Sequence, residues 1–133
     1  MTVLVDSNVI LDVVVDDAEW FGWSSQALAR ATEQGVLVIN PIIYAEVSTT
    51  FAGVEEVEAA VPATAFRREN LPWEAAFLAA KVFLAYRRRG GEWRAPLPDF
   101  YIGAHAAVAG YRLLTRDARR FRSYFPTVEL IAP

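Results

Sequence analysis

Cysteine is absent from the 133-residue sequence. Its absence excludes disulfide bridges, thiolate metal sites and cysteine nucleophiles together. Long apolar runs are also missing, and none approaches the roughly 20 residues that a helix needs to cross a bilayer. A secretory signal would have a basic start and a longer apolar run, whereas here Asp6 follows the apolar residues 3–5 directly. We therefore expect a protein of the reducing cytoplasm, without a membrane segment.

Basic residues are scarce in the first part of the chain and acidic residues are scarce in the second, although the overall net charge is only −3. Residues 1–80 carry three basic against twelve acidic side chains, a net charge of −9. Residues 81–133 carry ten basic against four acidic side chains, a net charge of +6. A basic half beside acidic positions suits an enzyme that binds phosphates and holds cations. A solvated charged surface accounts for the same distribution equally well.

Short apolar runs alternate with helical patterns along the chain. We predict strands at residues 2–5, 36–39, 63–67, 113–115 and 128–131. We predict helices at 8–15, 24–34, 42–51, 54–61, 73–89, 99–109 and 119–123, and a loop at 92–98, which contains two prolines. Strands that are apolar throughout imply a parallel sheet covered on both faces. The predicted fold class is α/β, a three-layer α/β/α sandwich around a mostly parallel sheet, with residues 1–133 forming a single domain.

Four carboxylates stand at the ends of separate predicted elements. Asp6 and Asp117 follow strands, Glu46 lies on the helix after strand 36–39, and Asp99 begins a helix of small and apolar residues. The ends of parallel strands share one edge of the sheet, where ligands of such folds bind. Each aspartate taken alone is better explained as a helix cap, and most exposed helical glutamates have no special role.

Taken together, the four acids point to a metal site. Carboxylates that converge in one cleft repel one another and raise each other's pKa unless a cation is present. Mg²⁺ and Mn²⁺ favour such oxygen ligands and usually keep several waters. A divalent ion held in this way can activate water and offset charge on a phosphodiester. We therefore predict metal-assisted phosphoryl chemistry, with the metal held by Asp6, Glu46, Asp99 and Asp117.

Four motifs occur in a fixed order: VDSNVI at residues 5–10, YAE at 44–46, LPDFYIGAHA at 97–106 and LTRD at 114–117. This set spans nearly the whole chain and resembles the PIN-domain nucleases, most closely the VapC-type toxins of bacterial toxin–antitoxin pairs. The resemblance implies an endoribonuclease dependent on Mg²⁺ (or Mn²⁺), the toxin of a type II pair, that cleaves structured RNA such as tRNA or rRNA by metal-activated water. It assigns the catalytic and metal-binding roles to Asp6, Glu46, Asp99 and Asp117.

The same resemblance implies further residues and partners. Asn8 and Thr115 would support the acids by hydrogen bonds, and the chain would form a homodimer and bind a VapB-like cognate antitoxin. For RNA binding we single out Arg116, beside Asp117, together with Arg87 and Arg88 near the end of a long predicted helix. The end of a helix also favours cations for its own reasons, which gives the last two arginines a second explanation.

His105, the one histidine, is expected to pack or form hydrogen bonds, because it is not one helical turn from Asp99. Two other enzyme classes share parts of the pattern. A phosphoacceptor receiver domain usually has a late lysine, whereas the one lysine here is Lys81, and a haloacid-dehalogenase-like phosphatase has an aspartate where this chain has Asn8. The alternative to the ribonuclease is a non-catalytic PIN-like module that binds RNA or protein. The presence of all four acids argues against it.

Overall fold

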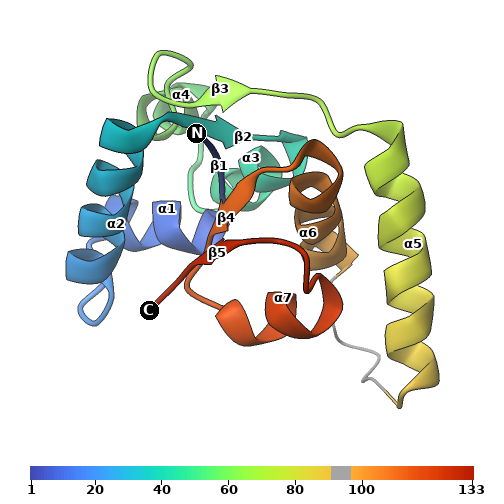
Figure 1. Cartoon of the computed structure of the whole chain (residues 1–133). Coiled ribbons are helices and arrows are strands. Elements are labelled where there is room, and N and C mark those ends of the chain that lie inside the picture. Colours follow the sequence, from blue (N-terminus) through green and yellow to red (C-terminus); the bar gives the residue numbers. More distant parts are fainter. Residues whose placement is uncertain (91–96) are drawn as a thin grey trace.

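The computed structural model describes residues 1–90 and 97–133, and its strands form one parallel sheet (Figure 1). The strands are β1 (Thr2–Val5), β2 (Val36–Ile39), β3 (Arg67–Arg68), β4 (Arg112–Leu114) and β5 (Leu130–Ile131). Their order across the sheet is β3-β2-β1-β4-β5, and each neighbouring pair is parallel. The side chains of residues 3–5 in the central strand β1 are fully buried, because helices cover both faces.

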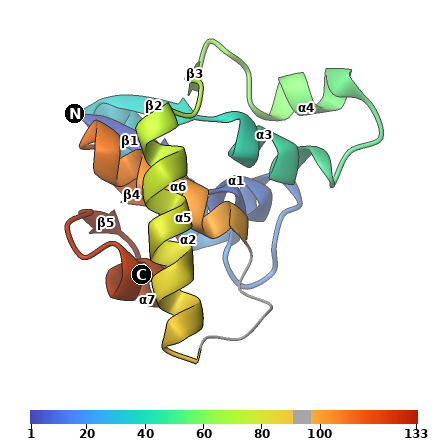
Figure 2. The ribbon, with the colours of Figure 1, turned by 90° about the vertical axis from the view of Figure 1, so that its right-hand side faces the viewer.

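Seven helices connect the described strands. They are α1 (Ser7–Val14), α2 (Phe21–Gln34), α3 (Pro41–Ser48), α4 (Val54–Ala60), α5 (Trp73–Arg88), α6 (Leu97–Ala109) and α7 (Ala118–Tyr124). Right-handed crossovers in this strand order place the first four on one face of the sheet and the last three on the other. The packing agrees, since α1 contacts α2 and α3, while α5 packs along α6 (Figure 2). This is the predicted three-layer α/β/α sandwich.

Several element boundaries differ from the sequence prediction. The predicted strand at 63–67 is a turn followed by β3, because the amides of Ala65 and Phe66 both bond to the carbonyl of Pro62. A turn also delays the last strand, since the amide of Val128 bonds back to Phe125. The helix α2 begins three residues early, α3 ends three residues early, and Leu97 and Pro98 belong to α6 and not to the predicted loop at 92–98. The remaining loop residues, 92–96, lie outside the described part. None of the described helices combines the length and the apolar character that a bilayer span would require.

The helix α6 has many buried residues, and a close contact fixes its position. Phe100 and Ile102 are buried, and a Cβ placed on Gly103 would lie 2.3 Å from atoms of the Phe125 ring. Only glycine therefore lets α6 approach the segment that follows α7 this closely. Asp99 stands four residues before Gly103 on the same helix face, so this contact also sets the distance between Asp99 and α7.

This contact gives a first prediction. Replacing Gly103 with alanine should lower the free energy of unfolding by about 1–3 kcal/mol, because the Phe125 ring must move out of a packed core. The matched control is Gly22→Ala in α2, where a Cβ would meet no atom within 4 Å. That change should leave stability unaltered or slightly raised. Urea unfolding followed by circular dichroism measures both, and a Gly103→Ala protein as stable as the control would contradict the close packing.

Candidate acidic active site

Asp6 lies at the carboxyl end of the central strand and is only 4% exposed. Its Oδ2 accepts a hydrogen bond of 2.8 Å from the Thr115 hydroxyl, and its backbone amide donates to the Leu114 carbonyl at 2.9 Å. Asp6 occupies the position before α1, but its side chain makes no capping hydrogen bond there. The cap explanation therefore does not describe what the Asp6 carboxylate does.

Burial raises the pKa of Asp6 from 3.8 to about 6. The Thr115 hydroxyl and the Ser7 amide oppose this shift by bonding to the carboxylate, while the negative charges of Glu46 and Asp117 add to it. These two other predicted acids therefore lie within electrostatic reach of Asp6. The ionised form of Asp6 is costly in this surrounding, so the site favours a positive charge.

Thr115 and Asn8 connect the two loops that follow β1 and β4. The buried Thr115 hydroxyl accepts from the Asp117 amide at 3.0 Å and from the Asn8 side-chain amide at 3.5 Å. The side-chain oxygen Oδ1 of Asn8 accepts a hydrogen bond of 3.2 Å from the backbone amide of Arg116. These contacts orient the Asp6 carboxylate and hold the backbone of Asp117. Asp117 precedes α7 without a capping side-chain bond.

Glu46 reaches this edge from α3. Its Oε1 accepts a 2.9 Å hydrogen bond from the Ser7 hydroxyl at the start of α1. Burial raises the pKa of Glu46, and the Ser7 hydroxyl partly opposes that shift. Ser7 was not among the predicted site residues, although its place in the sequence between Asp6 and Asn8 was the available signal.

Asp99 has a different partner. Its Oδ2 forms an ion pair with Nη1 of Arg120 on α7, and Nε of Arg120 lies 3.9 Å from Oδ2 of Asp117. Within residues 1–90 and 97–133, no three acidic or histidine side chains stand close enough together to hold a metal ion. The structure thus groups Asp6 electrostatically with Glu46 and Asp117, and the tight cluster of four acids that the sequence predicts is not formed. Asp99 faces a guanidinium group instead.

The residues nevertheless fit a hard divalent cation by their chemistry. All four offer carboxylate oxygens, which Mg²⁺ and Mn²⁺ prefer. The raised pKa of Asp6 shows that its negative charge lacks compensation from the chain itself. A bound cation would supply that compensation, and a site that includes Asp99 would require Asp99 to exchange its arginine partner.

The guanidinium of Arg116, predicted as an RNA contact, forms an ion pair with the buried Asp12, and the Arg116 side chain itself is 32% exposed. Its Nε and Nη2 bond to the two carboxylate oxygens of Asp12 at 2.8 and 2.9 Å, and its guanidinium lies 5.3 Å from the Trp20 ring centre. Asp12 is buried and also accepts a 2.7 Å bond from the buried Ser24 hydroxyl. The observed role of Arg116 is therefore to anchor the loop after β4 on α1 and α2.

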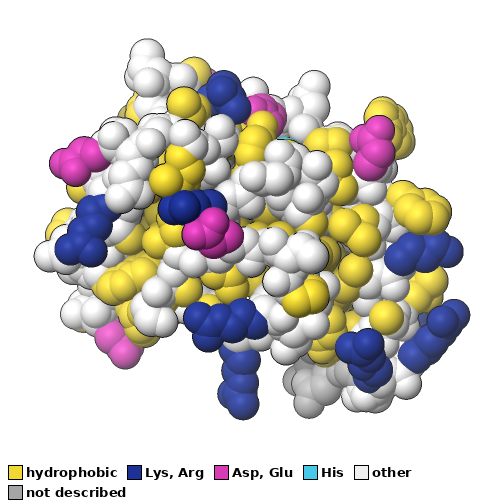
Figure 3. All heavy atoms as spheres, viewed as in Figure 1, with side chains coloured by type: hydrophobic (Ala, Val, Ile, Leu, Met, Phe, Trp, Pro, Cys, Tyr) yellow, Lys and Arg dark blue, Asp and Glu magenta, His cyan; other side chains and the backbone are white. Residues whose placement is uncertain are grey.

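The other two predicted RNA contacts, Arg87 and Arg88, are exposed at the end of α5. In Figure 3 the basic side chains gather over this end of α5 and over α7. The guanidinium of Arg87 lies 6.0 Å from the Phe83 ring centre. RNA binding by any of the three arginines stays a prediction.

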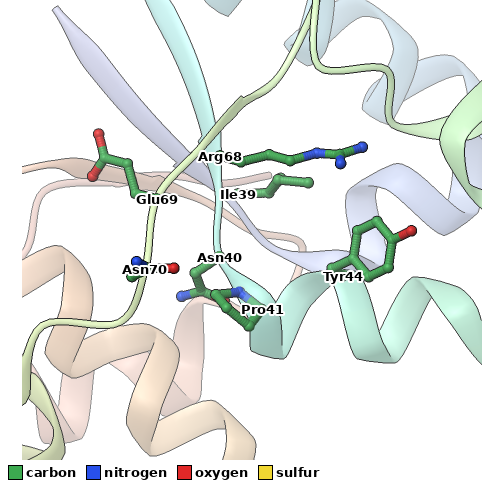
Figure 4. A pocket seen from close by; sticks show the side chains of 7 residues that line it. All are labelled: Ile39, Asn40, Pro41, Tyr44, Arg68, Glu69 and Asn70. Carbon is green, nitrogen blue, oxygen red and sulfur yellow. The ribbon is translucent and has the colours of Figure 1, made fainter.

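A pocket of about 280 Å³ opens where β2 and β3 end (Figure 4). It is lined by Ile39, Asn40, Pro41, Tyr44, Arg68, Glu69 and Asn70, and by none of the four predicted acids. Behind it the fully buried His105 shares a 3.0 Å hydrogen bond between its Nδ1 and the Asn40 side-chain nitrogen, and its Nε2 lies 3.7 Å from Glu69. Burial lowers the pKa of His105. The expectation that His105 packs and forms hydrogen bonds is confirmed.

Comparison with known proteins is consistent with this geometry. A family model described as PIN domain matches residues 3–124, whereas no curated protein matches the chain in sequence. The chain is similar to VapBC2 from Rickettsia felis bound to a DNA fragment from its promoter, with a TM-score of 0.75 and 14% identity over 99% of this chain and 98% of that chain. VapBC-1 from nontypeable Haemophilus influenzae gives a TM-score of 0.75 and 16% identity over the same shares. VapC20 from Mycobacterium tuberculosis, a sarcin-ricin loop cleaving toxin, gives a TM-score of 0.61 and 17% identity over 83% of this chain and 85% of that chain. At these identities the structural likeness establishes the fold alone.

The raised pKa of Asp6 predicts a specific pH dependence of stability. A folded-state pKa of about 6 against 3.8 means that the folded protein binds the proton more tightly than the unfolded chain. Stability is therefore lost as pH rises from about 4 to 6 and stays lower above that range. The Asp6→Asn protein, which carries no charge there, should exceed the unaltered protein at pH 7.5 by on the order of 1–3 kcal/mol in free energy of unfolding.

The measurement is urea unfolding in the presence of a chelator at several pH values. At about pH 3, below both pKa values, the two proteins should be equally stable, because Asp6 is then protonated in the folded protein and in the unfolded chain. A constant difference across the whole range would mean that a lost hydrogen bond, and not charge, causes the effect.

The ion pair between Arg116 and Asp12 predicts coupled mutations. Asp12→Asn and Arg116→Gln should each destabilise the fold, and the double substitution should cost less than their sum by about 1 kcal/mol or more. Additive losses in a thermal or urea double-mutant cycle would show that the pair contributes nothing, leaving Arg116 available for RNA.

Proposed function

Because the chain belongs to the PIN-domain family, we propose that it is a metal-dependent endoribonuclease and the toxin of a type II toxin–antitoxin pair. The observation that carries this proposal is the buried carboxylate of Asp6 at the end of the central strand, with Glu46 and Asp117 within electrostatic reach. A non-catalytic module would have no use for buried, mutually repelling acids at the ligand-binding edge of the sheet.

Asp6, Glu46, Asp99 and Asp117 would hold the cation, Mg²⁺ or Mn²⁺. When bound, such an ion offsets negative charge on a phosphodiester and promotes attack by water. The chain's own contribution is to orient the acids. The Thr115 hydroxyl holds Oδ2 of Asp6, and the Ser7 hydroxyl holds Oε1 of Glu46. Because both hydroxyls come from element ends with a fixed backbone, each carboxylate is limited to a narrow range of orientations.

The proposed substrate is a structured RNA, such as tRNA or rRNA. Residues 81–133 carry a net charge of +6. Among the described residues, basic side chains lie on α7 and at the end of α5 (Figure 3). Positive charge of this kind attracts phosphates of any sequence and brings the backbone to the acids. Arg87 and Arg88 are the proposed contacts, whereas the guanidinium of Arg116 is already used by Asp12. The sarcin-ricin loop cleaver among the similar structures supports an RNA of defined shape.

The proposed protein partners are a VapB-like antitoxin and a second copy of the chain. Two of the solved structures similar to this chain are VapBC toxin–antitoxin complexes. The outer surface of α5 also exposes Trp73 (89%), Phe77 (67%) and Leu84 (43%), one above the other on one side of the helix. An apolar surface of this kind is typical of a helix that another protein covers.

Activity tests the proposal directly. The purified chain should cut tRNA or rRNA with Mg²⁺ or Mn²⁺ and not with a chelator. Asp6→Asn and Glu46→Gln should each lower the rate by roughly 100-fold or more, because the cation loses a ligand at the reacting phosphate. The control is Glu55→Gln, which makes the same change at an exposed position of α4 and should retain the rate.

Expression in cells tests the proposal against the RNAs that are present there. Induction of the unaltered chain, but not of Asp6→Asn, should arrest growth and create discrete new RNA 5′ ends. Full cleavage by Asp6→Asn, or equal cleavage with chelator, would end the proposal. RNA binding without any cleavage would favour the non-catalytic module instead.

A further inference from the structure

Arg120 stands where the acidic residues of two helices meet. It projects from α7, three residues after Asp117, and pairs with Asp99 of α6. Its Nε is 3.9 Å from the Asp117 carboxylate, so one guanidinium group lies between two of the four acids. The Asp99 side chain is 15% exposed and that of Arg120 is 37% exposed.

We propose that Arg120 is the resident counter-ion of the acidic site and competes with the divalent cation for Asp99 and Asp117. This inference rests on the proposed function, because it presupposes that a cation binds there. Arg120 pairs with the acids while the cation is absent, and it leaves Asp99 when the cation binds.

The cost of burying charge is the first reason for this role. Asp99 is largely withdrawn from water, and an uncompensated carboxylate in such a place destabilises the fold. Arg120 supplies the compensating charge through a hydrogen-bonded pair. Asp6, Glu46 and Asp117 have no such guanidinium contact within hydrogen-bond distance among the described residues. Asp99 is therefore the acid whose charge the chain itself neutralises.

Repulsion between cations is the second reason. A divalent ion bound to Asp99 would stand a few ångströms from the guanidinium, and charges of +2 and +1 at that distance repel strongly in a partly buried site. The two cations therefore exclude each other from Asp99. Among the described residues Asp99 is paired with Arg120 and belongs to no group of three acids, as this exclusion requires.

Release of Arg120 requires no change of fold. Its side chain is more than a third exposed and is long enough to turn toward solvent by rotation about its own bonds. A bound cation can therefore take its place on a locally adjusted Asp99. Arg119 provides a matched control, since it is exposed on the same helix and has no side-chain ion pair among the described contacts.

The test is calorimetric titration of Mn²⁺ into the purified chain and into Arg120→Gln, Arg120→Lys and Arg119→Gln. Arg120→Gln should bind Mn²⁺ roughly two- to fivefold more tightly than Arg119→Gln, the range that loss of a partly exposed ion pair represents. Both substitutions remove one positive charge, so the difference between them reports the contact and not the overall charge. Arg120→Lys should bind close to the unaltered chain, because it keeps a cation beside Asp99.

Stability gives a second readout that needs no RNA and no activity. Coupling between two sites is reciprocal, so Mn²⁺ must stabilise Arg120→Gln more than it stabilises the unaltered chain. Without metal, Arg120→Gln should unfold at a lower urea concentration than Arg119→Gln. With saturating Mn²⁺ this difference should shrink, because Arg120 has by then left Asp99 in the unaltered chain.

Each outcome has a distinct meaning. Equal Mn²⁺ affinities for Arg120→Gln and Arg119→Gln would overturn the role of Arg120 and leave the proposed function intact. Weaker binding by Arg120→Gln would also overturn it, since Arg120 would then help to position the acids for the cation. If neither the unaltered chain nor any variant binds Mn²⁺, both this inference and the metal dependence of the proposed function fail.

Discussion

The hydrogen bond between the Thr115 hydroxyl and the Asp6 carboxylate is the contact on which the rest of the site depends. It joins the end of the central strand β1 to the end of its neighbour β4, at the edge where ligands of parallel sheets bind. Asn8 and the amide of Asp117 bond to the same hydroxyl, so four residues share one small polar cluster above an apolar core. The core buries Asp6, and this burial raises the pKa of Asp6 because the buried negative charge is costly. A cation bound there would offset that cost.

Arginine and acid pairs organise the surroundings of this cluster. Asp12 holds Arg116 and thereby fixes the loop after β4, while Arg120 is held by Asp99 and lies near Asp117. Both pairs join an acid of one element to an arginine of the β4–α7 segment. The arginines of the second half of the chain therefore contribute to the fold itself, and not only to the charge of its surface. Sequence alone assigns all of this charge to the surface, where phosphates would meet it.

The sequence predicts the elements that have strong local signals. The apolar runs of β1 and β2 and the Pro41 start of α3 are found where the pattern places them, because burial and helix geometry leave few alternatives. The strand β3 is misplaced, since a two-residue edge strand of exposed arginines has no apolar signal to detect. The placement of Asp6 at a strand end also follows from local pattern. The ion-pair partners of Arg116 and Arg120 cannot be predicted from local pattern. These pairs are separated by 104 and 21 residues, and they depend on how the helices pack.

The chain order of the Asp6–Thr115 pair has a consequence for synthesis. The two residues are 109 positions apart, and β1 has β4 as its second neighbour in the sheet. A ribosome that has made only the first hundred residues has therefore produced a central strand with one side unpaired and an aspartate without its hydroxyl partner. Contacts of such long sequence separation form late. The acidic centre is therefore assembled late in the nascent molecule. A partner that is present during translation can meet the polypeptide before the contact between Asp6 and Thr115 has formed.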